Sequence, residues 1–351
     1  MASRFVAATD EVWRLQTGSG AECRFFQAMA DRGHYRAAGG TRQGIYICTP
    51  GGRLLASINS LDADEVCKTL ASGLSAWDAL SPAERRLPAD LAARFEPRWE
   101  HARPEGGLIL ETTNRDLRGD PPTPQESPAQ RESPALPESP SASDAASCRD
   151  SRWNRDHAWF SRDEARAWLP ADATRGAVVN VPTALVERLA RFHLVDNVRG
   201  QTVPFTRADV AGSRIESRVT ARDGACVEIE LRGETRAVSG DQWDMSEAVW
   251  KPERAHPRGI VTRLLGQATF DLDAGRFTRF EMVGVGQRWG FSENNARRGQ
   301  PERSAIGFVI RLASSGAAQS VPPAFVDVYD AAWLVRPAAA PAAAPPATGR
   351  D

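Results

Sequence analysis

Apolar and polar residues alternate along residues 214–233, which read RIESRVTARDGACVEIELRG. The apolar positions of this pattern are Ile215, Val219, Val227, Ile229 and Leu231. Because successive side chains of a strand point to opposite faces, the alternation predicts two strands with one apolar and one water-facing side. Asp223-Gly224 lies between them, and this dipeptide is typical of a tight hairpin turn.

The same period continues toward the C-terminus. Residues 258–286 predict a second hairpin that turns at Asp273-Ala274-Gly275, and residues 304–313 predict a further strand. On the second strand of that hairpin, the residues expected to share the buried face are Thr278, Phe280, Met282 and Gly284. With the strand expected at residues 106–117, we predict about six to eight strands in a curved antiparallel sheet or partly open barrel covered by helices.

Helical spacing appears just before these strands. Ser161 is a candidate N-cap for a helix over Arg162–Leu169, and Glu164 completes a capping box. A second helix is expected after Pro182. Its apolar side is formed by Leu185, Leu189 and Phe192. Four aromatic residues are expected to pack the first helix against a sheet: Trp153, Trp159, Phe160 and Trp168.

The first hundred residues follow a mixed pattern. The elements predicted there are a strand within Arg4–Leu15, a helix over Ala21–Arg32, a hairpin of Ile45–Cys48 and Leu54–Ile58, a helix capped by Ser60 or Asp62, and a shorter helix that begins at Ser81-Pro82. The expected fold class is therefore α+β: an α/β part followed by a mainly antiparallel β part.

The order strand, helix, hairpin, helix resembles the thioredoxin fold over roughly residues 1–85, about a quarter of the chain. This resemblance implies a redox motif at the start of the first helix, where Cys23 lies. Gly20 and Phe26 hold the places three residues away, so the chain lacks the Cys-x-x-Cys of that family. The family's cis-proline is also missing, because Gln43 and Gly44 stand before the hairpin.

Composition divides the chain into segments. Residues 118–150 are rich in Pro and Ser and repeat Glu-Ser-Pro three times, at 126–128, 132–134 and 138–140. Such a sequence cannot bury enough apolar surface to offset the entropy of ordering, so we expect a disordered insertion. The predicted parts are a thioredoxin-like domain at 1–103, an antiparallel β-rich domain at 104–336 that contains the insertion, and a disordered Ala/Pro tail at 337–351.

Charge and cysteine content exclude some classes of function. The formal net charge is −1, which does not favour nucleic acid as a partner. The five cysteines show no disulfide or zinc spacing, so we expect reduced thiols, no metal and a cytoplasmic location. The N-terminal stretch lacks a signal-peptide pattern, and no apolar run is long enough for a membrane span. No cofactor motif is found; residues 284–290, GVGQRWG, are interpreted as a strand end.

Two candidate sites remain. Cys23 is either a reactive thiol at a helix N-terminus or a small residue that packs in the core. The densest polar cluster outside the insertion is His193, Asp196, Asn197 and Arg199, a candidate binding site beside the end of a helix. The leading hypothesis is a non-catalytic or weakly redox-active thioredoxin-like module joined to a β-rich binding domain, with a protein or a small apolar molecule as partner. The alternatives are a thiol oxidoreductase that uses Cys23 alone and a small-molecule or lipid carrier.

Overall fold

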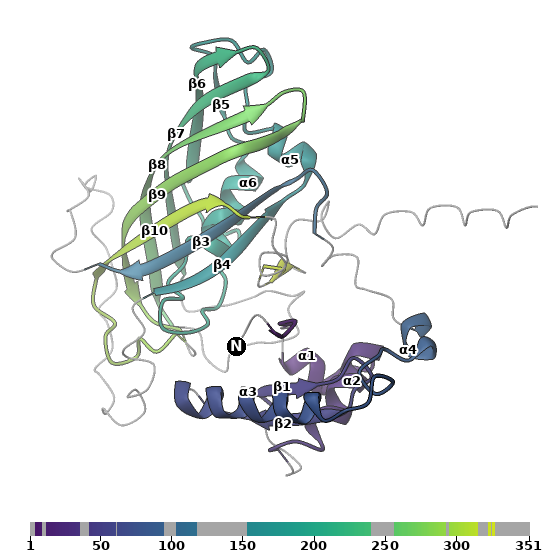
Figure 1. Ribbon diagram of the computed structural model, residues 1–351. Helices are drawn as coiled ribbons and strands as arrows, with labels where there is room; N and C mark the ends of the chain where they lie inside the picture. Colours follow the sequence, from purple (N-terminus) through teal and green to yellow (C-terminus); the bar gives the residue numbers. More distant parts are fainter. Residues whose placement is uncertain are drawn as a thin grey trace, which may run out of the picture.

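The computed structural model describes residues 4–8, 12–35, 42–60, 62–94, 103–117, 153–239, 256–292, 295–314, 322–323 and 325–326. The expected insertion at 118–150 and the expected tail at 337–351 lie outside the described residues. The described residues form two regions (Figure 1). The N-terminal region consists of helices and a hairpin, and the C-terminal region is built on a large sheet.

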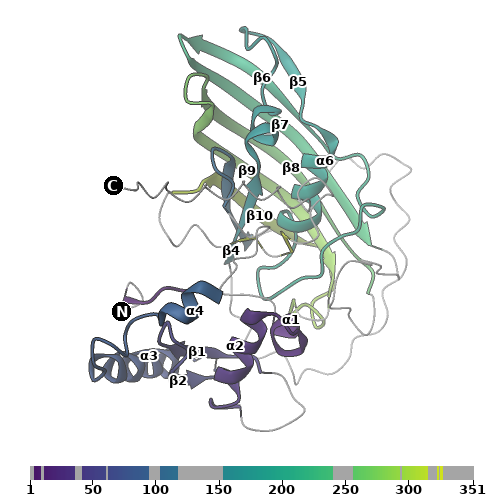
Figure 2. The same cartoon turned by 90° about the vertical axis from the view of Figure 1, so that its right-hand side faces the viewer.

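An eight-stranded antiparallel sheet dominates the C-terminal region, with the order β4-β3-β10-β9-β8-β7-β6-β5. Its strands are β3 (Leu108–Asp116), β4 (Trp153–Phe160), β5 (Val178–Asn180), β6 (Arg214–Asp223), β7 (Cys226–Ser239), β8 (Arg258–Asp271), β9 (Arg276–Gly290) and β10 (Ser304–Leu312). β4 and β5 are the two edges, so the sheet is open rather than a closed barrel. It curves around a helical layer (Figures 1 and 2).

The strand predicted at residues 106–117 is β3, and it lies inside this sheet. β3 pairs with β10 through Leu110↔Leu312 to Asp116↔Ile306, and with β4 on its other side. The chain segments before and after the expected insertion are therefore neighbouring strands. Both predicted hairpins are also present, because β6 pairs with β7 across residues 224–225 and β8 pairs with β9 across residues 272–275.

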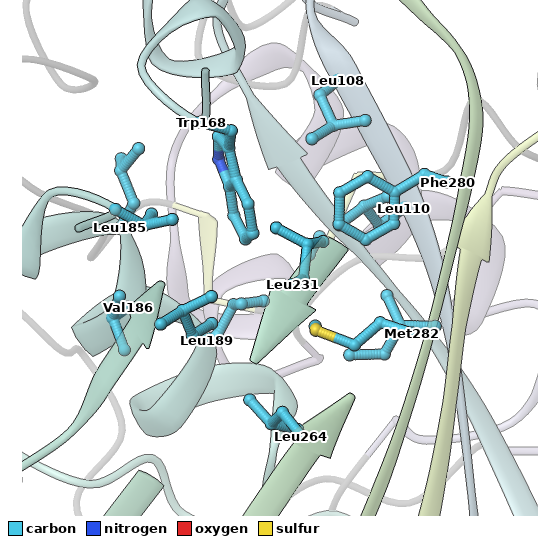
Figure 3. Packing of buried hydrophobic residues seen from close by; sticks show 14 of the residues in the cluster. Leu108, Leu110, Trp168, Leu185, Val186, Leu189, Leu231, Leu264, Phe280 and Met282 are labelled. Atoms are coloured by element: carbon cyan, nitrogen blue, oxygen red, sulfur yellow. The ribbon is translucent and has the colours of Figure 1, made fainter. Parts of the chain in front are cut away.

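A short helical layer fills the inner, concave face of the sheet. It consists of α5 (Arg162–Arg166), α6 (Thr183–Arg188) and a π-helical turn, Leu189–His193. Side chains from this layer point toward the sheet in Figure 3, where Trp168 lies against Phe280 with ring centroids 5.5 Å apart. The predicted capping box is confirmed, since Ser161 and Glu164 bond each other's backbone N–H.

The apolar core between sheet and helices is continuous. Its largest fully buried apolar side chains include Trp168, Phe160, Phe270, Phe280, Phe308, Leu108, Leu110, Leu189 and Ile215. Inward-facing residues at alternating positions of each strand supply one side of this core, which confirms the period-two prediction.

The structure changes one side chain of the predicted register and two predicted packing roles. Trp159 is buried in a separate small cluster with Ile109, Phe192 and Val326, apart from Phe160 and Trp168. Thr278 is exposed instead of sharing the buried face, because a bulge places Phe277 opposite Phe270 and leaves Thr278 without a cross-strand partner. Trp153 is 59% exposed. It begins the edge strand β4, where nothing but the Arg155 guanidinium covers its ring among the described contacts.

The N-terminal region contains α1 (Val12–Thr17), α2 (Ala21–Ala30), β1 (Ile45–Cys48), β2 (Leu54–Ile58), α3 (Ala63–Asp78) and α4 (Ala89–Arg94). The hairpin β1–β2 has the predicted bounds, and α3 begins after its N-cap Asp62 as expected. α3 packs on the hairpin at Gly73, where a side chain would collide with Ile47.

Two N-terminal predictions are wrong. The strand expected within Arg4–Leu15 is instead helical from Val12, and the Gln27 side chain donates to the carbonyl of Leu15 at the C-terminal turn of α1. The helix expected at Ser81-Pro82 begins only at Ala89. Residues 82–86 form turns and a bend instead, and Pro88 disfavours helical geometry at Leu87, the residue before it.

Candidate functional site

The inner face of the sheet changes from apolar to polar along its strands. On β3, the inward positions run from Leu108 and Leu110 through Thr112 to Asn114 and Asp116, and on β9 they run from Met282 to Arg288. We call the half of this face that carries Asp116, Arg258 and Arg288 the polar end. Two loop segments cover it: residues 194–206, and residues 291–292 with 295–300.

Arg297 is the centre of the polar end, and its guanidinium is almost fully buried. Its Nε and Nη2 donate to the two oxygens of Asp196 at 2.9 and 3.0 Å. Its Nη1 donates to Asp116 Oδ2 at 3.0 Å, and its Nη2 also donates to Asp116 Oδ1. One arginine therefore joins β3 to both covering loops by charge-assisted, two-pronged contacts, which are stronger than neutral hydrogen bonds.

Two further arginines complete what we call the arginine–aspartate cluster: Asp116, Asp196, Arg199, Arg288 and Arg297. Arg199 donates to Asp116 Oδ2 at 2.9 Å and to the Gln300 side-chain oxygen at 2.7 Å. Arg288 donates to the backbone carbonyl of Gln300 at 2.8 Å and lies 3.5 Å from Asp196 Oδ2. The cluster thus holds three guanidinium groups against two carboxylates.

Arg258 lies beside the cluster, on β8, and its hydrogen bonds to described residues go to neutral acceptors. Its guanidinium donates to Thr202 Oγ1 at 3.3 Å and to the Pro204 carbonyl at 3.0 Å, and it stacks 4.1 Å from the centre of the Phe205 ring. Thr202 in turn contacts Ser292 at 3.1 Å. Arg258 therefore fixes the first covering loop without a carboxylate partner.

All four residues of the candidate binding site lie at the polar end. His193 Nδ1 lies 2.8 Å from Asp156 Oδ2 on β4. Asp196 and Arg199 belong to the arginine–aspartate cluster. Asn197 accepts from the side chain of Asn114, and its carbonyl accepts from Asn154 at 2.7 Å. The structure therefore brings these four residues together with strands β3, β4 and β9.

Electrostatics keep the cluster charged. Burial raises the pKa of the Asp116 carboxyl, but the hydrogen bonds and charge of Arg297 outweigh it and hold the pKa below its ordinary value. Burial lowers the pKa of both Arg258 and Arg288 to about 10. All these groups are ionised at neutral pH, so they suit charge binding and orientation better than proton transfer.

The other candidate, Cys23, lies in the first turn of α2 with only 2% of its surface exposed. Because a reactive thiol must be reached by its target, this burial favours the packing interpretation. Cys48 is half-buried, which raises its pKa, while Cys67 and Cys226 are exposed. Within the described ranges, no group of three His, Cys, Asp or Glu side chains is placed to hold a metal ion.

A hollow lies on the opposite, outer face of the sheet. Leu265, Val283 and Val309 occupy neighbouring positions on β8, β9 and β10, and Val285 lies beside them. Leu265 and Val283 are about half exposed, on a face whose other side chains are mostly charged. The hollow has a volume of about 340 Å³, and Glu230 and Glu281 stand at its rim.

Sequence reasoning missed the partners of the predicted cluster. Asp116, Arg288 and Arg297 are far apart in the chain and meet only through strand pairing and loop closure. One signal was present: Arg288 follows Gly284 and Gly286 at the inward positions of a strand, where a charge is out of pattern. Such a charge indicates a buried partner, although the pattern does not identify it.

Among the described residues, no helix has the length and apolar character needed to span a membrane. We compared the chain with protein families, with curated proteins and with solved structures, and none of the three comparisons gave a match.

Proposed function

We propose that the chain is a non-catalytic binding protein whose β-rich domain binds a partner protein through the hollow on the outer face of its sheet. The observation that carries this proposal is the group of aliphatic side chains at Leu265, Val283, Val285 and Val309, which water covers in the isolated chain. Contiguous apolar patches on an otherwise charged surface commonly mark interaction sites.

The filling of the inner face supports a binding scaffold over a carrier. Trp168, Leu189 and Phe280 meet in the space that a carrier would keep for its ligand (Figure 3). The burial of Cys23 likewise supports binding over single-thiol chemistry. In this proposal the partner inserts an aliphatic side chain into the hollow.

Site-directed photo-crosslinking in cells that make the protein tests the proposal. A photoreactive residue at Gln267, in the hollow, is compared with one at Thr220, an exposed position on β6 outside the hollow. We expect a discrete crosslinked product from position 267 alone. Leu265→Thr with Val283→Thr should abolish it, because threonine keeps strand propensity but removes apolar surface.

Val178→Thr is the matched control, since Val178 is also exposed but lies on the edge strand β5. The crosslinked product should persist in this variant. Melting temperatures of all variants should agree with that of the wild type, because exposed positions contribute little to stability. Equal products from positions 267 and 220, or a product unaffected by the double substitution, would contradict the proposal.

A further inference from the structure

We propose that the polar end binds a phosphate group, at a site formed by the guanidinium groups of Arg199 and Arg288 beside Gln300. This site lies on the inner face and is independent of the outer-face hollow. Its basis is the charge balance and the hydrogen bonding of the arginine–aspartate cluster.

Within the arginine–aspartate cluster, positive charge exceeds negative charge. The cluster contains three arginines and two aspartates, an excess of one, and all five groups contact one another through the bonds of Arg297, Asp116 and Asp196. Arg258 adds a further cation whose hydrogen bonds go only to neutral groups. Asp209 and Asp196 attract Arg258 without a hydrogen bond to it. A buried charge without a matching partner is costly, so an anion bound here would be stabilising.

Hydrogen bonding also leaves donor capacity unused. The Arg288 side chain is only 3% exposed, yet its buried Nε donates no hydrogen bond, although Asp196 lies 3.5 Å away. Its two hydrogen bonds to protein both come from Nη1, to the carbonyls of Gly290 and Gln300. A guanidinium has five N–H donors, so Arg288 can still donate to a ligand.

Gln300 marks where the phosphate would enter. Its side-chain oxygen accepts from Arg199 Nη1, and its backbone carbonyl accepts from Arg288 Nη1, so both arginines approach the same residue. The Gln300 side chain is at the surface, and the Arg199 side chain is 14% exposed. A phosphate oxygen can replace this neutral amide oxygen at Arg199, and charge-assisted bonds of this kind are roughly twice as strong as neutral ones.

The shape of the donors favours phosphate over a simple halide. A guanidinium group can donate two parallel N–H···O bonds to two oxygens of a tetrahedral oxyanion, whereas chloride is a single atom and cannot accept such a pair. Arg297 already uses its fork on the two aspartates. Arg199 also donates to Asp116 through Nε and Nη2, which leaves its Nη1, the group that bonds the Gln300 side-chain oxygen. The ligand would therefore take Arg199 Nη1 together with the unused N–H groups of Arg288.

The test is thermal unfolding of the full chain at constant ionic strength, with inorganic phosphate or glycerol phosphate titrated against chloride. We expect a saturable rise of several degrees in the melting temperature of the wild type, because a ligand that binds only the folded state stabilises it. Sulfate and phosphate also stabilise proteins weakly by exclusion from the surface, but that effect does not saturate.

Three variants make the result specific. Arg199→Gln should weaken phosphate binding at least about tenfold, as expected for loss of a charged hydrogen bond. Gln300→Glu should raise the melting temperature without phosphate and remove the response to it, because a carboxylate then occupies the place of a phosphate oxygen. Arg263→Gln, which removes an exposed arginine from the outer face, should respond as the wild type does.

A wild-type response that does not saturate, or an equal saturable response in Arg199→Gln, would overturn the inference. A lower melting temperature in Gln300→Glu than in the wild type would also contradict it. If phosphate and glycerol phosphate both act, the tighter one identifies whether the site takes the free ion or an ester, and either result supports the proposal.

Discussion

The apolar end and the polar end of the inner sheet face bury side chains of opposite character. At the apolar end, Phe270, Phe280 and Leu110 pack against the helical layer, and the indole N–H of Trp168 is buried there without a hydrogen-bond partner among the described residues. At the polar end, the same strands carry Asp116 and Arg288. The charged partners of these two side chains, Arg297 and Asp196, come from the two covering loops. The apolar end therefore supplies stability, while the polar end holds charged groups in fixed positions, as a binding site requires.

Phe280→Ala should produce the largest loss of stability. Phe280 is 1% exposed and contacts the rings of Trp168 and Phe277, so its removal leaves a cavity in the apolar end. The free energy of unfolding, measured with urea, should fall by about 3–5 kcal/mol. Phe280→Leu should cost clearly less. A negligible loss in both variants would mean that this end of the face is not a packed core.

Asp196→Ala should follow, with a loss of about 3 kcal/mol, because it deprives buried Arg297 and Arg288 of a carboxylate. The double variant Asp196→Leu with Arg297→Met should lose less than the sum of its single variants, since it removes a carboxylate and a guanidinium together. Additive losses in this double-mutant cycle would show that the two residues do not act as a pair.

Gly286→Ala tests the transition between the two ends. A side chain at Gly286 would approach the Val261 carbonyl oxygen to 1.9 Å, so β8 and β9 would have to separate at this point. We expect a loss of about 1–3 kcal/mol in the free energy of unfolding. Gly224→Ala, at a hairpin turn with open space around it but a φ of +54°, measures the cost of backbone strain without a steric collision. A loss at Gly286 no greater than at Gly224 would argue against close strand contact.

The pH dependence of the free energy of unfolding should distinguish the polar end from the apolar end. The folded-state pKa of Asp116 is lowered, so its contribution is fully present above the ordinary value of 3.8 and is lost as the pH falls through the folded-state pKa. Asp116→Asn should therefore reduce the acid destabilisation measured by chemical unfolding below about pH 4. Phe280→Ala should keep the wild-type slope, and a flattened slope in that variant would contradict the separation.

The apolar end was predictable from sequence, and the polar end only in part. Period-two alternation identified β6 to β9 because each inward residue meets the same apolar layer regardless of its partner. The loop residues His193 and Asp196 stood out by density of polar side chains. Their partners Asp156 and Arg297 could not be identified, since ion-pair partners depend on the strand order and not on local spacing.

Local sequence patterns also gave wrong predictions at positions where tertiary contacts determine the backbone conformation. The bulge that exposes Thr278 shows in the sequence only as the three-residue step from Phe277 to Phe280, which strict alternation cannot place on one face. Residues 12–17 carry residues common in strands, but without a neighbouring strand to pair with they form a helix whose backbone bonds are internal.

The most direct test of the comparison is the phosphate-induced rise in melting temperature, measured side by side in Phe280→Ala and Arg199→Gln. Phe280→Ala should melt at a much lower temperature but keep the full rise, because the polar end is intact. Arg199→Gln, with a side chain at the partly exposed rim, should melt close to the wild type but lose most of the rise. The reverse pattern, or an equal loss of the rise in both variants, would contradict the assignment of stability to one end and binding to the other.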